Sequence, residues 1–329
     1  MDGQVGASAR VGAGSGVALS TLRDYAAIAR PDHWFKNVFM LPGAALAWVL
    51  MKPQPAEQML LALVLAVIAT CLIASANYTI NEWLDAATDR HHPIKRHRPS
   101  AAGRVRQPWI FVQWAGLAAL GLGIAATLST VFFATALLLL LMGLAYNVPP
   151  VRTKDLPYLD VLSESINNPL RFVLGWAALI GDVLPPSSIL LAYWLAGAYL
   201  MAVKRYAEYR YIGPAAAVRY RRSFRLYSEE TLLTSAVFYA LASAFLLGVF
   251  LIKYRIEFLL SMPFLALLFA WYLALGQRIP SPAQAPEKLY QETGFVAYVG
   301  FVAGLITALF FIDLPWLASL MEPRLITLG

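Results

Sequence analysis

Long apolar runs recur along the whole chain, and they constrain its fold more than any other feature. Nine stretches approach the length of a membrane helix, which needs about 20 mostly apolar residues. Hydrophobic residues make up 59% of the sequence, against roughly 45–50% in a soluble domain, so the bilayer is the expected solvent. We predict an all-α, polytopic membrane protein with nine transmembrane helices in one bundle, at about 35–52, 58–81, 108–126, 128–147, 158–181, 188–205, 231–252, 257–276 and 293–312.

Two features limit what else the chain can contain. Residues 11–19 are too rich in glycine to supply the apolar core of a signal peptide. We expect a disordered cytoplasmic tail over 1–21 and one transmembrane domain over 22–329. The single cysteine, Cys71, lies within an apolar run, which argues against a disulfide framework or a cysteine-rich zinc site.

The positive charge is distributed unevenly between the two sides of the predicted membrane. Most of the 26 Lys and Arg residues lie in the N-terminal tail and in the loops after the second, fourth, sixth and eighth runs. Positively charged loops remain on the cytoplasmic side, so we expect the N-terminus and these loops in the cytoplasm of a multi-pass plasma (inner) membrane protein. The same asymmetry explains the net charge of +7, and no nucleic-acid partner is expected.

An acidic motif follows the second apolar run, with Asn81, Glu82, Asp85 and Asp89. Positions 81, 85 and 89 recur every four residues, so a helix continuing out of the membrane would place them on one face. Like charges stacked in this way repel one another. Mg²⁺ removes that repulsion, because it prefers oxygen ligands and fills its remaining positions with water or substrate phosphates.

A basic cluster lies just beyond the acidic motif, in Lys95-Arg96-His97-Arg98-Pro99. Lysine and arginine are the usual partners of phosphate oxygens, so the two clusters together indicate a site for a metal and a phosphate. The alternative is a solvated loop in which Asp85 and Asp89 pair with Arg90, Lys95 and Arg96. Acids that begin within the end of a membrane span are costly and usually functional, which favours the site.

A second acidic pair, Asp160 and Glu164, stands four residues apart at the start of the fifth run, next to Arg152 and Lys154. It predicts either a second Mg²⁺ site or an ion-paired helix start, and both remain open. Arg171 lies within the same run. An arginine at that depth predicts either a functional site or an ion pair with Glu164, seven residues before it.

Four segments of this sequence resemble the UbiA-type prenyltransferase superfamily. The acidic motif and its basic cluster resemble the first aspartate-rich motif of that superfamily. The other three resemble its decaprenyl-phosphate phosphoribosyltransferase branch, and they are Arg30-Pro31-Asp32-His33-Trp34-Phe35-Lys36-Asn37, Lys204-Arg205-Tyr206-Ala207-Glu208 and Arg222-Ser223 with Tyr227-Ser228.

The resemblance implies a nine-helix enzyme of cell-wall biosynthesis. Such an enzyme uses Mg²⁺ to bind phosphoribosyl diphosphate and transfers the ribose phosphate to a polyprenyl phosphate. It implies metal binding by Asn81, Glu82, Asp85 and Asp89, with Asp160 and Glu164 as the second set. Catalytic roles are implied for Asp85, Asp89, Lys36 and Lys204. Substrate contacts are expected from Lys95, Arg98, Tyr146, Arg171, Arg205, Tyr206 and Glu208.

Two departures from the family pattern keep an alternative open. Glu82 stands where the family usually has aspartate, and Glu164 supplies a second acid that the phosphoribosyl branch generally lacks. The alternative is a prenyltransferase that attaches an isoprenoid from a prenyl diphosphate to an aromatic or lipid acceptor. A transporter is a remote third, because the charges cluster on one side and no inverted repeat is visible. A homo-oligomer remains open.

The segment from Tyr209 to Arg225 is basic and amphipathic. It either lies on the membrane and gates the site, or carries its charge only because basic loops remain in the cytoplasm.

Overall fold

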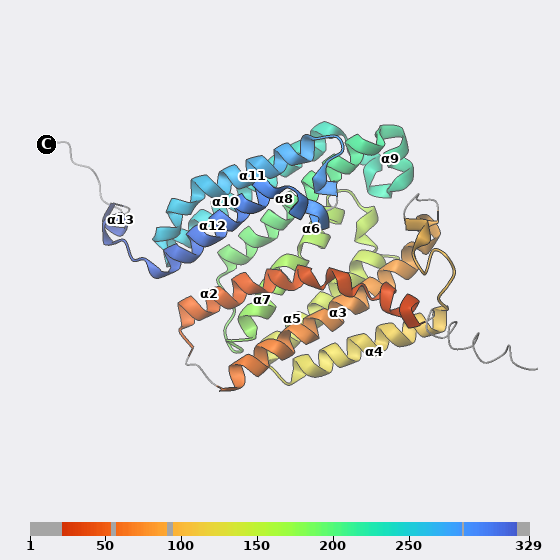
Figure 1. The fold of residues 1–329 in the computed structure, drawn as a ribbon, viewed down its shortest axis with the longest axis horizontal. Coiled ribbons are helices and arrows are strands. Elements are labelled where there is room, and N and C mark those ends of the chain that lie inside the picture. The colour runs from red at the N-terminus through yellow and green to blue at the C-terminus, as the bar shows by residue number, and fades with distance from the viewer. Residues whose placement is uncertain (1–21, 54–56, 91–94, 285, 321–329) are drawn as a thin grey trace, which may run out of the picture. The chain divides into compact units, whose positions relative to one another are not determined.

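The computed structural model describes residues 22–53, 57–90, 95–284 and 286–320, which form helices and no strand (Figure 1). The predicted tail, residues 1–21, lies outside the described residues. After a helix at residues 22–28, the α-helices are α2 (Leu41–Met51), α3 (Glu57–Asp89), α4 (Gln107–Ala126), α5 (Thr130–Asn147), α6 (Leu159–Ser165), α7 (Asn167–Ala177), α8 (Ser187–Ile212), α9 (Pro214–Tyr220), α10 (Glu229–Tyr254), α11 (Met262–Gln277), α12 (Thr293–Phe311) and α13 (Pro315–Leu320). Short 3₁₀ helices are η1 (Pro31–Met40), η2 (Lys95–His97), η3 (Thr153–Asp155), η4 (Arg222–Leu226), η5 (Ile256–Ser261), η6 (Pro282–Gln284) and η7 (Pro286–Gln291).

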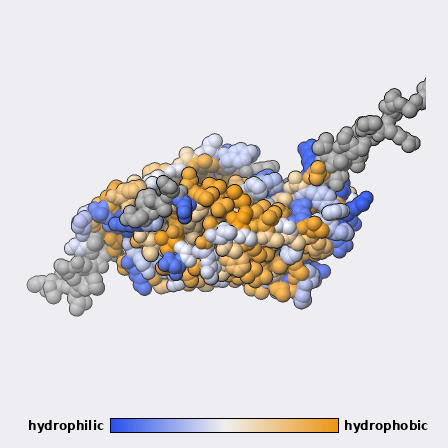
Figure 2. All heavy atoms as spheres, turned by 90° about the horizontal axis from the view of Figure 1, so that it is seen from below, coloured by the Kyte–Doolittle hydropathy of each residue, from blue (hydrophilic) through white to orange (hydrophobic). Residues whose placement is uncertain are grey.

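Within the described ranges, eight helical stretches are long and apolar enough to cross a membrane. On the face shown in Figure 2, apolar side chains cover wide continuous areas, as expected of surface that contacts lipid. The prediction of an all-α polytopic membrane protein is therefore confirmed, and the count of nine spans is not. The eight stretches are Leu22–Met51, Gln58–Asp89, Gln107–Ala126, Thr130–Asn147, Ser187–Ile212, Glu229–Tyr254, Ile256–Gln277 and Thr293–Phe311.

The difference lies in the fifth predicted span, 158–181, which is not one helix. It is divided into α6, of 7 residues, and α7, of 11 residues, with Ile166 between them. Pro169 stands in the first turn of α7 and has no N–H to donate to the carbonyl of Ser165, so a continuous helix loses a hydrogen bond there. The chain also divides here into two compact units, one with residues 22–152 and 170–184, the other with 153–169 and the described residues from 185 onward.

The first unit is built around α3, which packs against α4 and α5. The predicted tight hairpin between the third and fourth spans is present, because α4 ends at Ala126 and α5 starts at Thr130. Ser129 caps α5 by accepting a hydrogen bond from the backbone N–H of Phe132 at 3.1 Å. At 33 residues, α3 continues well past its apolar part, and this extension carries the acidic motif.

Two glycines allow α2 and α7 to approach each other closely within the first unit. A Cβ atom on Gly43 would lie 1.9 Å from the carbonyl oxygen of Phe172, and one on Gly175 would lie 1.9 Å from that of Met40. Small residues at such contacts let helix backbones pack closely in membranes, where packing replaces the hydrophobic effect as the force between helices.

We therefore expect Gly175→Ala to destabilise the first unit by about 1–3 kcal/mol, because a methyl group forced against backbone must push the helices apart. Cys71 offers a reporter, since it is buried in this unit and a thiol-reactive dye would label it only on unfolding. Gly116→Ala is the matched control, because a Cβ there would meet nothing within 4 Å. Equal melting temperatures for the two variants would contradict the predicted contact.

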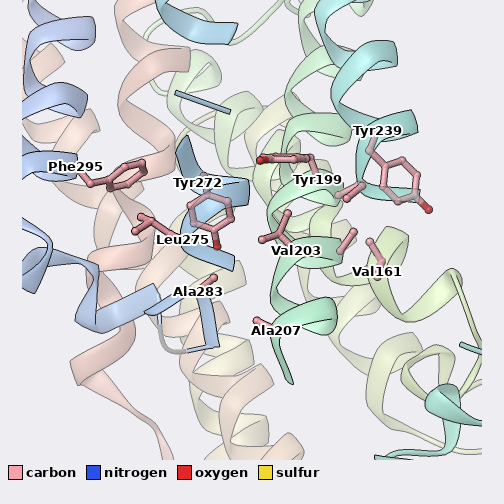
Figure 3. Packing of buried hydrophobic residues seen from close by; sticks show 12 residues of the cluster. Val161, Tyr199, Val203, Ala207, Tyr239, Tyr272, Leu275, Ala283 and Phe295 are labelled. Atoms are coloured by element: carbon pink, nitrogen blue, oxygen red, sulfur yellow. The ribbon is translucent and has the colours of Figure 1, made fainter. Parts of the chain in front are cut away.

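The second unit is centred on α8, which packs against α6, α10 and α11. Figure 3 shows Tyr199, Val203 and Ala207 along α8, with Tyr272 and Leu275 of α11 beside them. At the start of α10, Ser228 forms a capping box with Thr231. This core fixes the part of α8 that leads into the predicted Lys204–Glu208 segment.

Candidate active site

The last turns of α3 carry the acidic motif, and Asn81, Asp85 and Asp89 stand on one helix as predicted. Glu82 has different surroundings. Its carboxylate is almost fully buried and accepts hydrogen bonds from the Arg30 guanidinium and the backbone N–H of Ser100, each at 3.4 Å. These contacts give Glu82 the role of joining α3 to the segments before and after it.

Asp85 and Asp89 are each held by one arginine. The Arg152 guanidinium donates to Asp85 at 3.1 Å, and both side chains are about one quarter exposed, at 21% and 24%. The Arg98 guanidinium donates to Asp89 at 2.6 Å, with the Asp89 side chain only 8% exposed. Arg152 also donates to the backbone carbonyl of Asn147, whose side chain accepts a hydrogen bond from Asn81.

These pairs differ from those of the solvated-loop alternative, which named Arg90, Lys95 and Arg96. The acids are paired, but Asp85 contacts Arg152, a residue 67 positions away in the sequence. Arg90 donates instead to the backbone carbonyl of Ala101 at 3.2 Å. The result is an end of α3 at which two carboxylates are each paired with a guanidinium group, Asp85 with Arg152 and Asp89 with Arg98.

The donor set on this face fits Mg²⁺ bound together with a substrate. No group of three His, Cys, Asp or Glu side chains that could hold a metal ion occurs in the parts of the chain that the structure covers. Mg²⁺ typically takes one or two carboxylates and completes its shell with water and substrate phosphates. Asp85 and the amide oxygen of Asn81 are the groups that would hold it, because Glu82 is enclosed and Asp89 is nearly so.

The predicted Lys36 lies beside the same end of α3. Its ammonium group and the Arg30 guanidinium each lie 5.9 Å from the centre of the Tyr78 ring, one helical turn before Glu82. Cation–π contacts of this kind attract a basic group to the face of an aromatic ring. Lys36 is therefore held against Tyr78, next to the acidic motif.

Arg171 belongs to the first unit and is buried. Its Nε donates to the side-chain oxygen of Asn37 at 2.9 Å, and the Asn37 amide donates to the thiol of Cys71 at 3.1 Å. The structure thus joins two residues that the sequence placed in separate motifs. The two other groups named for this part of the chain are Lys95, in η2, and Tyr146, which precedes Asn147 at the end of α5.

In the second unit, Asp160 is fully buried and accepts four hydrogen bonds. One carboxylate oxygen accepts from Arg205 (3.2 Å), Ser223 (3.1 Å) and Arg221 (3.4 Å), and the other accepts from the Tyr227 hydroxyl (2.8 Å). Burial and the neighbouring carboxylate raise the pKa of Tyr227, so its phenol keeps the proton that it donates. A carboxylate with four donors does not fit a metal site, because it has only about four acceptor positions.

Arg205 is enclosed by carboxylates. Its guanidinium, 2% exposed, contacts Asp160, Glu164 at 2.8 Å and Glu208 at 3.1 Å. These contacts match the ion-paired helix start, which is one of the two alternatives for Asp160 and Glu164. Arg205 is also a predicted substrate-binding residue, and in this structure its guanidinium braces the three carboxylates.

The neighbours of Arg205 on α8 differ in exposure. Lys204 is partly exposed. Tyr206 is buried in an apolar cluster with Tyr209, Ala217, Phe224, Tyr227 and Leu232, and the Arg210 guanidinium lies 5.4 Å from its ring centre. Tyr206 is therefore packed in the protein interior, whereas the Lys204 side chain is partly exposed at the surface.

Sequence reasoning missed three groups that shape the site, namely Arg152 at Asp85, Asn147 at Asn81 and Tyr78 beside Lys36. Arg152 was noted only as a neighbour of Asp160. The sequence does show Asn147 at the end of the fourth apolar run and Arg152 shortly after it. Nothing in that pattern indicates that either residue contacts α3.

The chain is similar to several known proteins. A family model described as the UbiA prenyltransferase family matches residues 38–299. The decaprenyl-phosphate phosphoribosyltransferase of Mycolicibacterium smegmatis is 29% identical over 206 residues, which is 62% of this chain and 62% of that protein. The protein of the same name from Corynebacterium glutamicum is 31% identical over 186 residues, 54% of this chain and 52% of its own length. The matched region thus spans less than two thirds of either relative.

The fold is also similar to a solved structure. A UbiA homologue from Archaeoglobus fulgidus, bound to GPP and Mg²⁺, superimposes with a TM-score of 0.66 at 21% identity. The match covers 88% of this chain and 100% of the other. At this level of identity the likeness establishes a shared fold.

Proposed function

The chain belongs to the UbiA prenyltransferase family, and we propose that it is a Mg²⁺-dependent membrane phosphoribosyltransferase. It moves the 5-phosphoribosyl group of phosphoribosyl diphosphate to a polyprenyl phosphate of the decaprenyl type and releases diphosphate. The product feeds the synthesis of arabinofuranosyl lipid donors for the cell wall. We place the enzyme in the plasma membrane, with its N-terminus and active site on the cytoplasmic side, where positively charged loops remain.

The observation that carries this proposal is the pairing of carboxylates with guanidinium groups at the end of α3. Asp85 and Asn81 would hold Mg²⁺, while Arg98, Arg152 and Lys36 offer positive charge to phosphate oxygens. Bound Mg²⁺ would neutralise the charge that develops on the leaving diphosphate. The names of the two bacterial relatives support a ribosyl donor over an isoprenoid one.

The reaction breaks the bond between C1 of the ribose and the diphosphate, and it forms a bond from C1 to a phosphate oxygen of the lipid. The attacking phosphate is already an anion at neutral pH, so no strong general base is required. The tasks of the chain are to hold the two substrates in line and to stabilise the departing charge. A soluble donor and a bilayer acceptor can meet only at the membrane surface, which is where the last turns of α3 would lie.

The alternative, prenyl transfer, rested on Asp160 and Glu164 as a second metal motif. That support is weakened, because Asp160 is saturated by four donors and Glu164 pairs with Arg205. We keep prenyl transfer as an arm of the experiment.

The purified full-length protein, given Mg²⁺, polyprenyl phosphate and phosphoribosyl diphosphate labelled in the ribose, should transfer label into the solvent-extracted lipid. Diphosphate should appear in equal amount. A parallel reaction contains a labelled prenyl diphosphate and an aromatic acceptor. Label that enters lipid only from the prenyl diphosphate would replace this proposal with prenyl transfer, and label from neither donor would refute both.

A further inference from the structure

The four donors to Asp160 come from two places. Arg205 lies on α8, in the core of the second unit. The other three, Arg221, Ser223 and Tyr227, all lie between α9 and the start of α10. One buried carboxylate therefore ties a stretch of seven residues to the first turn of α6.

This stretch belongs to a basic segment that we define as residues 213–227. Its inner side is apolar, since Ala217, Phe224 and Tyr227 are buried in the cluster around Tyr206. Its outer side presents Arg219, Arg222 and Arg225, which are exposed. The buried carboxylate of Asp160 accepts the hydrogen bonds that hold this segment in place.

We propose that Asp160 is a positioning residue that anchors the basic segment and does not bind a metal ion. By holding the segment, Asp160 fixes the backbone that carries the exposed arginines Arg219, Arg222 and Arg225. The Mg²⁺ test below rests on the proposed function, whereas the anchoring does not. The proposal therefore requires a measurement of folding as well as one of turnover.

Limited digestion with trypsin measures the anchoring directly, because the basic segment contains the cleavage sites. In Asp160→Asn, an amide N–H₂ replaces an acceptor of several hydrogen bonds, and we expect cleavage at Arg219, Arg222 and Arg225 to become about 10- to 100-fold faster. The cut positions are identified by mass spectrometry on the full-length protein in nanodiscs.

Asp155→Asn is the matched control, because Asp155 contacts Arg222 of the same segment at 3.6 Å in a pair whose arginine side chain is 74% exposed. Exposed ion pairs contribute little, so cleavage should stay within about twofold of the unmodified chain. Tyr227→Phe keeps the ring and removes one donor to Asp160, and it carries the test if Asp160→Asn does not fold. Cleavage of Asp160→Asn no faster than that of Asp155→Asn overturns the anchor. If Asp160→Asn does not fold, the anchor is overturned when Tyr227→Phe is cleaved no faster than Asp155→Asn.

The Mg²⁺ requirement separates an anchor from a metal ligand. For the phosphoribosyl transfer described above, Asp160→Asn should leave the half-saturating Mg²⁺ concentration unchanged. A tenfold or greater increase in that concentration, as expected for Asp85→Asn, would identify Asp160 as a metal ligand and overturn the proposal. If the unmodified chain transfers no ribose phosphate, the proposed function fails alone, because the proteolysis result is independent of turnover.

Discussion

Replacing Asp85 with asparagine is expected to slow phosphoribosyl transfer about a thousandfold while leaving the chain folded, which corresponds to about 4 kcal/mol of lost transition-state stabilisation. Three carboxylates of the acidic motif pair with an arginine, and Asp85 is the most exposed of them, with 24% of its side chain accessible. Asparagine keeps the size of the side chain but removes the charge that would hold Mg²⁺ at the diphosphate. The measurement is kcat and KM across a range of Mg²⁺ concentrations.

Two further variants test whether the loss of turnover in Asp85→Asn reflects the loss of a metal ligand. Asp182→Asn removes an exposed carboxylate of the same unit and should leave turnover unchanged. Arg152→Gln removes the partner of Asp85 and should raise the KM for the diphosphate donor without raising the Mg²⁺ requirement. If Arg152→Gln reproduced the whole effect of Asp85→Asn at saturating Mg²⁺, Asp85 would only orient Arg152, and the metal assignment would be lost.

Replacing Arg205 with methionine is expected to cause the largest loss of stability of any single substitution discussed, about 3–5 kcal/mol. The guanidinium contacts three carboxylates, and one of them, Asp160, is fully buried. Methionine fills similar space, so the loss reports mainly the uncompensated negative charge. Arg205→Lys should recover only part of it, because a single ammonium group cannot reproduce the planar fork that reaches several partners.

Arg210→Met is the matched control on the same helix. Arg210 pairs with Glu229 at 3.3 Å, and the Glu229 side chain is about half exposed, so this pair should contribute no more than about 1 kcal/mol. The melting temperature can be followed by size-exclusion chromatography after heating in detergent. Similar melting temperatures for the Arg205→Met and Arg210→Met chains would refute the bracing role of Arg205.

The sequence was sufficient for features that depend on local geometry. Apolar run length located the apolar part of eight spans, although the first span begins at Leu22 and the second and sixth predicted spans continue to Asp89 and Ile212. The four-residue spacing of Asn81, Asp85 and Asp89 predicted a helix that extends beyond the membrane. Both inferences need only the rise and period of an α-helix. The exception, the run at 158–181, is explained by Pro169, whose missing N–H interrupts a segment that hydropathy alone treats as continuous.

Features that depend on distant partners could not be predicted from the sequence. The four-residue spacing of Asp160 and Glu164 is compatible with a metal site and with an ion-paired helix. The decision depends on donors that lie between 41 and 67 positions further along the chain. Likewise, the pairing of Asp85 with Arg152 depends on how α3 and α5 pack. Spacing determines which groups share a face, whereas tertiary packing determines how many of their hydrogen bonds are already taken.

The close contact at the two glycines is reciprocal, since Gly43 of α2 admits the carbonyl of Phe172 in α7, and Gly175 of α7 admits that of Met40, the residue just before α2. A larger residue on one helix would move both backbones apart, and the second glycine would then no longer be needed. Effects at residues that share a contact are not additive. We therefore expect that related chains that have lost one of the two glycines will tend to have lost the other.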